Sequence, residues 1–389
     1  MKVYLLTIIA ILHCIAIRAQ NDRISNLPFY DFGKGLGITT PDSLYQLNIR
    51  FRMQSRVTYG NKSDAAYIEG QIRRLRLRFD GFVGRPNIMY VIQLSFSPGD
   101  VGVTTEGDNL NVIRDAVVFY APSERWNFGF GQTKLPGNRQ RVNSSSALQL
   151  TDRSINNAVF NIDRDFGIFM NYINETTSSF SWNIKTAIST GDGRNFTRDP
   201  DNGLAYTGKI ELLPFGSFIQ NGVYFEGDIK REKRLKLMVS GVYHFNDKAK
   251  RAYGVFGNDL SSKKDLTSIF VDILTKYKGF ALMSTYFSRS TDNPSDQNGN
   301  NVFVGHGWDA QSSYINKYNL EYIARYSFQK SASKTSTFNS KKQFTMGLTK
   351  YIREHIFKLQ LEGGVEVTTN HDNSRQSAPM ARFQLEIGI

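Results

Sequence analysis

The chain has 389 residues, of which 48 are lysine or arginine and 35 are aspartate or glutamate, so its net charge is +13 with histidine neutral. This balance indicates an anionic partner, but nucleic acid fits poorly because the sequence contains none of the usual nucleic-acid-binding motifs. A single cysteine, Cys14, excludes a framework of disulfide bonds.

The first predicted element is an export signal over residues 1–19. Lys2 precedes a long apolar run, and we expect cleavage after Ala19. Removing this segment leaves 46 basic and 35 acidic side chains, a net charge of +11. We expect an N-terminal periplasmic segment over residues 20–43 and one domain over residues 44–389, because no linker or shift in composition divides the rest.

Two consecutive segments then place arginine at alternate positions, with apolar residues between. These arginines are Arg50, Arg52 and Arg56 in the first segment and Arg74, Arg76 and Arg78 in the second. A β-strand sends successive side chains to opposite faces, so each segment has one basic face and one apolar face. A membrane barrel accommodates both, because its outside meets lipid and its lumen meets water. The pattern predicts an all-β, transmembrane antiparallel β-barrel.

Turn signals recur along the chain and separate segments of roughly 9–14 residues, the length that a tilted strand needs to span a bilayer. We predict sixteen strands, and an even number with both ends in the periplasm is typical of bacterial barrels. The strands are 44–59, 70–84, 88–97, 111–121, 125–133, 166–174, 178–190, 203–214, 233–246, 267–278, 280–290, 305–315, 317–329, 342–351, 355–368 and 379–389.

Short links between these strands alternate with long ones, which distinguishes periplasmic turns from external loops. The long links are 60–69, 98–110, 134–165, 191–202, 247–266, 291–304 and 330–341. Hairpin pairing of the first two strands predicts Arg56 beside Arg74, and Arg50 beside Arg78 or Asp80.

The arginine rows predict a lumen wall that draws anions inward. Guanidinium suits phosphate in particular, because its planar fork donates two parallel hydrogen bonds and stays charged. Several similar sites in series also avoid a deep trap for a conducted ion. Alternatively, the arginines pair with lumen acids such as Asp80 or line a general pore.

An enzymatic site is not expected. The histidines of the mature chain, His244, His306, His355 and His371, are scattered without metal-ligand spacing or a neighbouring nucleophile motif. We therefore expect no catalytic residues, no metal and no cofactor.

Five short motifs follow one another along the chain: LNIRFRMQ, IRRLRLRFDG, IRDAVVFY, GFGQTKLPG and TDRSINNAV. Their order resembles the phosphate-selective porin O/P family of Gram-negative outer membranes, most strongly from about residue 44 to 170. The resemblance implies that Arg50, Arg73 and Arg74 are lumen arginines. It also implies that Arg141 and Arg153 are basic groups on a long third loop folded into the pore.

That third loop, residues 134–165, is the longest predicted link. Its basic residues are Lys134, Arg139, Arg141, Arg153 and Arg164. Folded inward, it would form the constriction; as an external loop, it would bind lipopolysaccharide phosphates. The family also has a basic cluster in its fifth external loop, for which Lys248, Lys250 and Arg251 are candidates.

The chain departs from the expected pattern at two positions. Arg73 shares strand parity with lipid-facing Leu75 and Leu77, so either the strand bulges there or Arg73 snorkels at the rim. Arg114 stands beside Asp115 where the family tends to have two adjacent acids. One acid fewer makes the lumen more positive, so we expect anion preference rather than strict phosphate selectivity.

We expect a passive outer-membrane porin that prefers small anions, with phosphate or polyphosphate favoured. Its expected partners are these anions, outer-membrane lipid and lipopolysaccharide, and two further copies of the chain in a homotrimer by family resemblance. One alternative is a general diffusion porin without selectivity. Another is a binding or assembly protein of the outer membrane, with the barrel closed by its loop.

Overall fold

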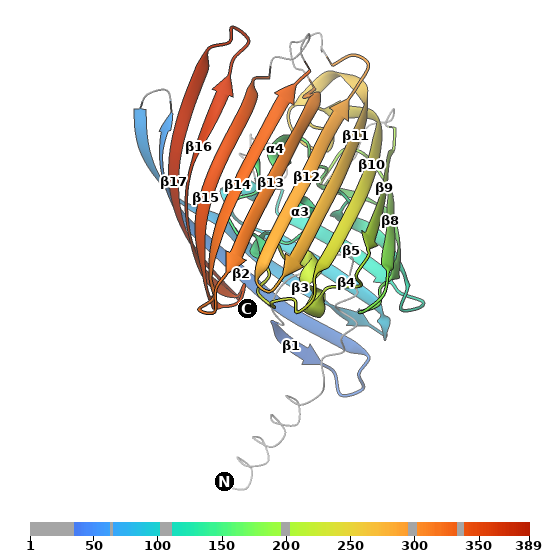
Figure 1. Cartoon of the computed structure of the whole chain (residues 1–389). Coiled ribbons are helices and arrows are strands. Elements are labelled where there is room, and N and C mark those ends of the chain that lie inside the picture. The colour runs from blue at the N-terminus through green and yellow to red at the C-terminus, as the bar shows by residue number, and fades with distance from the viewer. Residues whose placement is uncertain (1–34, 63–64, 102–110, 196–202, 295–301, 333–337) are drawn as a thin grey trace.

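The chain folds into a closed antiparallel barrel of sixteen strands, β2 to β17 (Figure 1). The computed structural model describes residues 35–62, 65–101, 111–195, 203–294, 302–332 and 338–389. The predicted export signal lies outside these described residues. Neighbouring strands pair antiparallel in chain order, and β17 pairs with β2 to close the barrel. The predicted fold class is confirmed.

The barrel strands agree with the predicted segments. The first eight are β2 (Tyr45–Lys62), β3 (Ala65–Val83), β4 (Arg85–Ser95), β5 (Ile113–Tyr120), β6 (Trp126–Lys134), β7 (Arg164–Asn174), β8 (Ser181–Ser189) and β9 (Ala205–Leu213). The other eight are β10 (Lys236–Arg251), β11 (Asp259–Tyr277), β12 (Phe280–Ser290), β13 (Gly305–Ile315), β14 (Leu320–Ser331), β15 (Ser340–Arg353), β16 (Phe357–Thr369) and β17 (Arg375–Gly388). Each predicted segment overlaps one strand, so the predicted count is confirmed.

The predicted links between strands are less accurate. Most of the predicted link 247–266 is strand, because β10 and β11 extend into it on both sides. Most of the predicted link 60–69 likewise belongs to β2 and β3. The extensions of β10 and β11 carry polar residues at successive positions, and that of β3 begins with successive apolar ones, so they lack the alternation of apolar and polar residues that predicts a strand.

Side-chain alternation sets the two faces of the wall as predicted. On β2, Gln54 and Arg56 are buried inside the barrel, whereas Val57 and Tyr59 are exposed on its outside. The same alternation buries Arg74, Arg76 and Arg78 on β3 and leaves the leucines between them on the outer face. None of the helices in the described part of the chain is long and apolar enough to cross a membrane.

The barrel has a turn end, where β2 begins and most connections are short, and a loop end opposite. A short additional strand, β1 (Leu36–Thr39), pairs with residues 46–49 of β2 at the turn end. It lies on the same side of β2 as β17, whose pairing with β2 covers residues 52–60. The sequence did not predict this strand.

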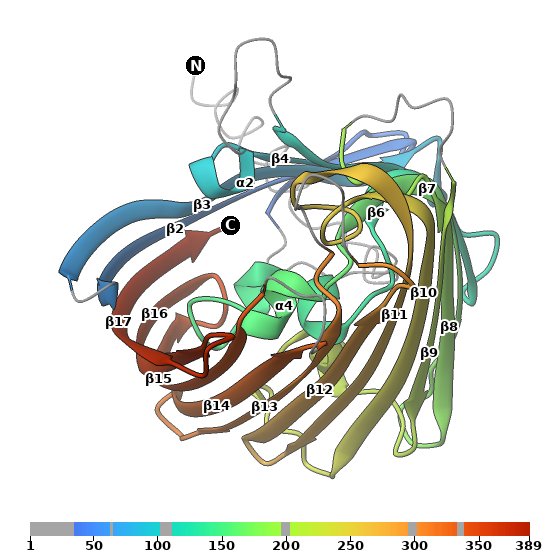
Figure 2. The ribbon, with the colours of Figure 1, turned by 90° about the horizontal axis from the view of Figure 1, so that it is seen from above.

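The link between β6 and β7 folds into the barrel, which confirms the predicted inward third loop (Figure 2). This inner loop, residues 135–163, contains the short helices α3 (Arg139–Val142), η2 (Ser145–Ala147) and α4 (Ile155–Val159). Most of its residues are buried. Leu135, Phe160 and Ile162 pack against apolar lumen residues of β7, β10, β11 and β12, so one side of the lumen holds a hydrophobic core.

A second long link folds inward from the turn end. This floor segment, residues 214–235, joins β9 to β10 and contains the short helix η3 (Ile219–Tyr224). Phe218 packs with Leu213, Met238 and Leu274 at the base of the wall. The sequence predicts no role for this segment, although the other connections at the turn end between described strands are short turns.

Candidate functional site

A cavity of about 470 Å³ lies between the inner loop and the wall of the barrel. Twelve basic side chains line it: Arg73, Arg74, Arg76, Arg78, Arg114, Lys134, Arg141, Arg153, Arg164, Arg194, Arg325 and Arg382. Four acidic side chains line it: Asp100, Asp152, Asp163 and Glu366. The excess of basic groups makes the cavity a focus of positive potential.

Two β-bulges supply basic side chains to this cavity. On β3 the pairing with β2 shifts between Gln54 and Ser55, so Arg73 is an extra residue beside Arg74. Its guanidinium therefore turns into the lumen, which settles the two predicted possibilities in favour of a bulge. A matching shift between β4 and β5 makes Arg114 the extra residue beside Asp115, and both side chains are buried.

The arginines of β2 and β3 face one another in pairs. Arg50 lies opposite Arg78, as predicted, and Arg52 lies opposite Arg76. The predicted neighbour of Arg56 is wrong, since Arg56 lies opposite Gln71. The register that pairs Arg50 with Arg78 places residue 72 opposite Arg56, and the bulge at Arg73 moves this partner by one further position. Like charges directly opposite one another are destabilising unless other groups compensate them.

Asp80 compensates the pair at the turn end of this row. It is fully buried and forms ion pairs with Arg50 at 3.1 Å and with Arg78 at 2.9 Å. The predicted alternative, in which lumen acids pair with the arginines, therefore holds for these two residues.

Asp152 of the inner loop compensates the arginines at the other end of the row. Its carboxylate forms ion pairs with Arg56, with Arg73 at 2.7 Å and with Arg74 at 3.2 Å. Burial opposes ionisation of Asp152, but attraction by Arg73, Arg74 and Arg56 outweighs it and holds the pKa of this carboxyl far below its usual range. The carboxylate thus fastens the inner loop to the arginine wall.

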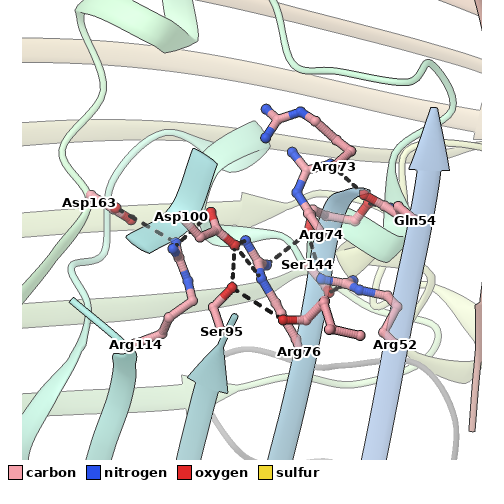
Figure 3. A network of polar contacts seen from close by, with 12 residues as sticks. Arg52, Gln54, Arg73, Arg74, Arg76, Ser95, Asp100, Arg114, Ser144 and Asp163 are labelled. Carbon is pink, nitrogen blue, oxygen red and sulfur yellow. Dashed lines mark hydrogen bonds and ion pairs between the residues drawn. The ribbon is translucent and has the colours of Figure 1, made fainter. Parts of the chain in front are cut away.

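Asp100 enters the same network from the link between β4 and β5 (Figure 3). It lies in the short helix α2 (Pro98–Val101) and accepts hydrogen bonds from Arg76 at 2.9 Å and from Ser95 at 2.7 Å. Arg114 forms an ion pair with it at 3.0 Å. Burial opposes ionisation here too, but Arg76 and Arg114 outweigh it and lower the pKa of Asp100.

The middle of the arginine row touches the inner loop through hydroxyl groups. Arg52 donates to Ser144 at 3.1 Å and to Ser145 at 2.7 Å, and Arg76 donates to Ser145 at 3.0 Å. A smaller cavity of about 30 Å³ lies on the turn-end side, lined in part by Arg50, Arg52 and the last residue, Ile389. Arg76, Arg78 and Gln93 line both cavities, so the row links them.

All nine residues predicted for the site lie inside the barrel. Arg73, Arg74, Arg76, Arg78, Arg141 and Arg153 line the large cavity, and Arg50 and Arg52 line the small one. Arg56 lines neither and binds Asp152. Arg141 pairs with Asp163, whereas Arg153 donates to the carbonyl oxygens of Gln140 and Asn143 and so stabilises the fold of the inner loop.

The candidates of the fifth external loop lie elsewhere. Lys248, Lys250 and Arg251 belong to the loop-end part of β10 and line neither cavity. Arg251 forms an ion pair with Asp259 at 3.5 Å.

Several basic residues of the cavity were not predicted from the sequence. Arg325 and Arg382 come from β14 and β17, on which they share the lumen face with Ser327 and Gln384, respectively. Alternation along these strands could have identified both. Arg194 follows β8 in a link without such a pattern, so no sequence signal marks it.

The closed barrel, the inward loop and the charged passage define an outer-membrane channel of the porin class. Its fold resembles that of DcaP, an outer membrane channel of Acinetobacter baumannii, at 15% identity and a TM-score of 0.58 over 91% of this chain and 99% of that one. The anion-selective porin from Comamonas acidovorans shares 10% identity, with a TM-score of 0.58 over 89% and 100% of the two chains.

The trimer form of OmpT, an outer membrane protein of Vibrio cholerae, shares 11% identity, with a TM-score of 0.51 over 89% of this chain and 99% of that one. No curated protein matches the sequence. Residues 46–212 match the model of the family of phosphate-selective porins O and P. This match supports the resemblance to that family of Gram-negative outer-membrane porins which the order of the motifs indicated.

Proposed function

We propose that the protein is a passive channel that prefers small anions, with phosphate or short polyphosphates as the favoured solutes. The observation that carries this proposal is the large cavity, in which twelve basic side chains face four acidic ones. The arginine row continues from it into the small cavity. Because successive side chains on one strand face lie about 6.6–6.8 Å apart, an anion moves between neighbouring guanidinium groups in short steps.

Unused hydrogen-bond donors on side chains that line the cavity support this proposal. The Nε–H groups of Arg74, Arg114, Arg325 and Arg382 are buried and have no partner among the described residues. All four side chains line the large cavity. An unsatisfied buried donor costs on the order of 1–3 kcal/mol, and an oxyanion with several acceptor oxygens offsets this cost.

The relatives support the coarser features. One structural neighbour is an anion-selective porin and another forms a trimer. We propose a homotrimer here as well, with outer-membrane lipid around it and lipopolysaccharide at the basic loop-end residues.

Planar-bilayer recordings of the purified protein across a salt gradient test the function. We expect a reversal potential of the sign that anion permeation gives, and a lower chloride current when phosphate is added, because phosphate occupies the arginines. A reversal potential near zero would instead show a general diffusion porin. A complete lack of conductance would favour a binding or assembly protein.

A further inference from the structure

The floor segment, residues 214–235, crosses the turn end of the barrel beneath the inner loop. It is fastened to four turns of the wall. Ser217 N–H of the segment donates to Thr176 O in the turn after β7. Asp228 of the segment accepts a hydrogen bond from Gly279 N–H in the turn after β11. Arg231 reaches Asn316 in the turn after β13, and Lys230 pairs with Glu354 in the turn after β15. The segment therefore spans the base of strands β7 to β16.

Contacts with the wall hold the segment at a fixed height. Lys276, near the end of β11, is fully buried and donates to the carbonyl oxygens of Gly222 at 2.8 Å and Gly227 at 2.6 Å. The ring of Phe225 stacks on that of His355 with centroids 4.9 Å apart. The Lys276 hydrogen bonds and the stacked rings are directional, unlike apolar packing, so they fix the orientation of the floor segment as well as its distance from the wall.

Two side chains connect the floor segment to the inner loop. Arg139 of the loop donates to the carbonyl oxygens of Val223 and, at 2.6 Å, Phe225. In the other direction, the carboxylate of Glu226 accepts hydrogen bonds from the backbone N–H of Gln149 at 2.9 Å and the side chain of Gln140 at 3.2 Å. The inner loop thus supplies the buried Arg139 guanidinium to the backbone of the floor segment, and the floor segment supplies the buried Glu226 carboxylate to the backbone of the inner loop.

The buried side chains behind these contacts carry both signs of charge, with Lys209 at 3.9 Å from Asp272, and they lack the excess of basic groups found in the cavity on the other side of the inner loop. Asp272 and Glu321 are fully buried there, and they accept hydrogen bonds from the Arg139 N–H and the Gln149 side chain, respectively. The small cavity at the turn end instead lies against β2, β3 and the end of β17. The floor segment therefore backs the half of the lumen that holds the hydrophobic core and these buried pairs of acids and lysines, and the arginine wall borders the remaining opening.

We propose that the floor segment is a second internal plug, which holds the inner loop in place through Arg139 and Glu226 and confines ions to the arginine wall. This inference rests on the proposed function for the identity of the conducting path. Arg139 and Glu226 are positioning residues, because they act on permeation through the loop. Loosening either contact opens a wider route past buried acids and lysines, where the excess of arginine is missing.

The test compares Arg139→Ala and Glu226→Ala with wild type in planar bilayers. We expect at least a two-fold rise in single-channel conductance and a lower anion-to-cation permeability ratio. Arg139→Lys retains a charged donor and should restore wild-type values. The matched control is Lys233→Ala, which removes an exposed basic side chain of the same segment, and it should conduct like wild type.

Hydrogen exchange of residues 139–149, measured on the full-length folded protein, gives a readout that needs no conduction. Glu226→Ala should accelerate exchange of the Gln149 amide at least ten-fold. If both alanine variants fold and keep wild-type conductance, permeability ratio and exchange, the proposal is wrong. If wild type shows no anion preference or no current, the proposed function fails, and conductance or exchange of the variants still decides the role of the floor segment. If Arg139→Ala does not fold, Glu226→Ala carries the same test.

Discussion

At the scale of single residues, Asp152 combines two opposite effects on the passage. Its carboxylate pairs with Arg56, Arg73 and Arg74, so it fastens the inner loop to the wall. The same contacts reduce the positive charge that a passing anion meets. Asp152 therefore lowers the attraction of the passage for anions and at the same time fixes the position of the constriction.

Replacing Asp152 by asparagine should separate these effects. The Asp152→Asn side chain keeps its volume but removes the negative charge, so the anion-to-cation permeability ratio should rise about two-fold. The protein should also lose on the order of 3–5 kcal/mol of stability, because the buried guanidinium groups of Arg56 and Arg74 and the partly exposed one of Arg73 lose their counter-ion. Reversal potentials and urea unfolding measure the two changes. Asp372→Asn, in the exposed link before β17, is the control and should change neither.

Arg76 is the residue whose loss should weaken permeation most. It lines both cavities and contacts Asp100 and Ser145. In Arg76→Ala we expect a several-fold lower anion current at low salt, because the middle step of the arginine row is missing. Arg76→Lys should lie in between, since an ammonium keeps the charge but not the fork. Arg85→Ala, exposed at the turn end, provides the comparison; equal currents in both alanine variants would contradict the proposed path.

At the scale of secondary-structure elements, the bulge on β3 allows two consecutive arginines to face the lumen. Regular alternation would direct Arg73 towards lipid, where an arginine at mid-depth costs about 2–4 kcal/mol. The sequence identified this conflict from parity alone. It could not determine the outcome, because the partner that holds Arg73 inside, Asp152, lies 79 residues later in the chain.

Because of this bulge, the barrel should tolerate deletion of Arg73. Removing Arg73 leaves Gln54 opposite Arg74 and Ser55 opposite Ile72, so every other residue of β3 keeps its face. We expect this variant to fold into a barrel, seen as unchanged circular dichroism, and to match Arg73→Ala in conductance. Removing Leu75 must instead turn an arginine towards lipid or shift the register, and should prevent folding. A folded Leu75 deletion with wild-type current would contradict this account.

The strands could be predicted because each one repeats a local pattern, whereas the floor segment could not. Its contacts are made by single residues such as Glu226 and Lys276, whose partners are remote in sequence and whose spacing follows no period. The same holds for Arg194, which reaches the cavity from an irregular link. Long-range packing inside the lumen, rather than propensity, determines these positions.

At the scale of the whole molecule, the lumen has two unlike halves. Leu135 and Phe160 of the inner loop join a hydrophobic core against β7 to β12, as in a soluble protein. The opposite half carries the arginines, with Asp100 and Asp152 between them. A loop held by apolar packing on one side and by ion pairs on the other is a fixed constriction rather than a swinging gate.

The acidity of the medium should have little effect on this constriction above pH 4. Burial opposes ionisation of Asp163, but Arg141, Arg164 and Arg114 outweigh it and lower the pKa, as the neighbouring arginines do for Asp100 and Asp152. A lowered carboxyl pKa contributes stability that is fully present above the unfolded value of about 4 and is lost as the pH falls through the lower folded value.

Burial and the charges of Lys358 and Lys276 also lower the pKa of His355, which lines the small cavity and stays neutral. We therefore expect the noise of the open-channel current to be constant from pH 8 to 4.5. A conductance transition with a midpoint near pH 6 would show that an unrecognised group controls the loop.

The short strand β1 has a consequence for how the barrel closes. Every barrel has a seam where its first and last strands meet, and an exposed strand edge there invites slippage or pairing with another chain. Because β1 occupies residues 46–49 of β2 and β17 occupies residues 52–60, the last strand cannot slide towards the turn end without displacing β1. The strand β1 thus blocks this movement of β17 and helps to fix the register in which β17 pairs with β2.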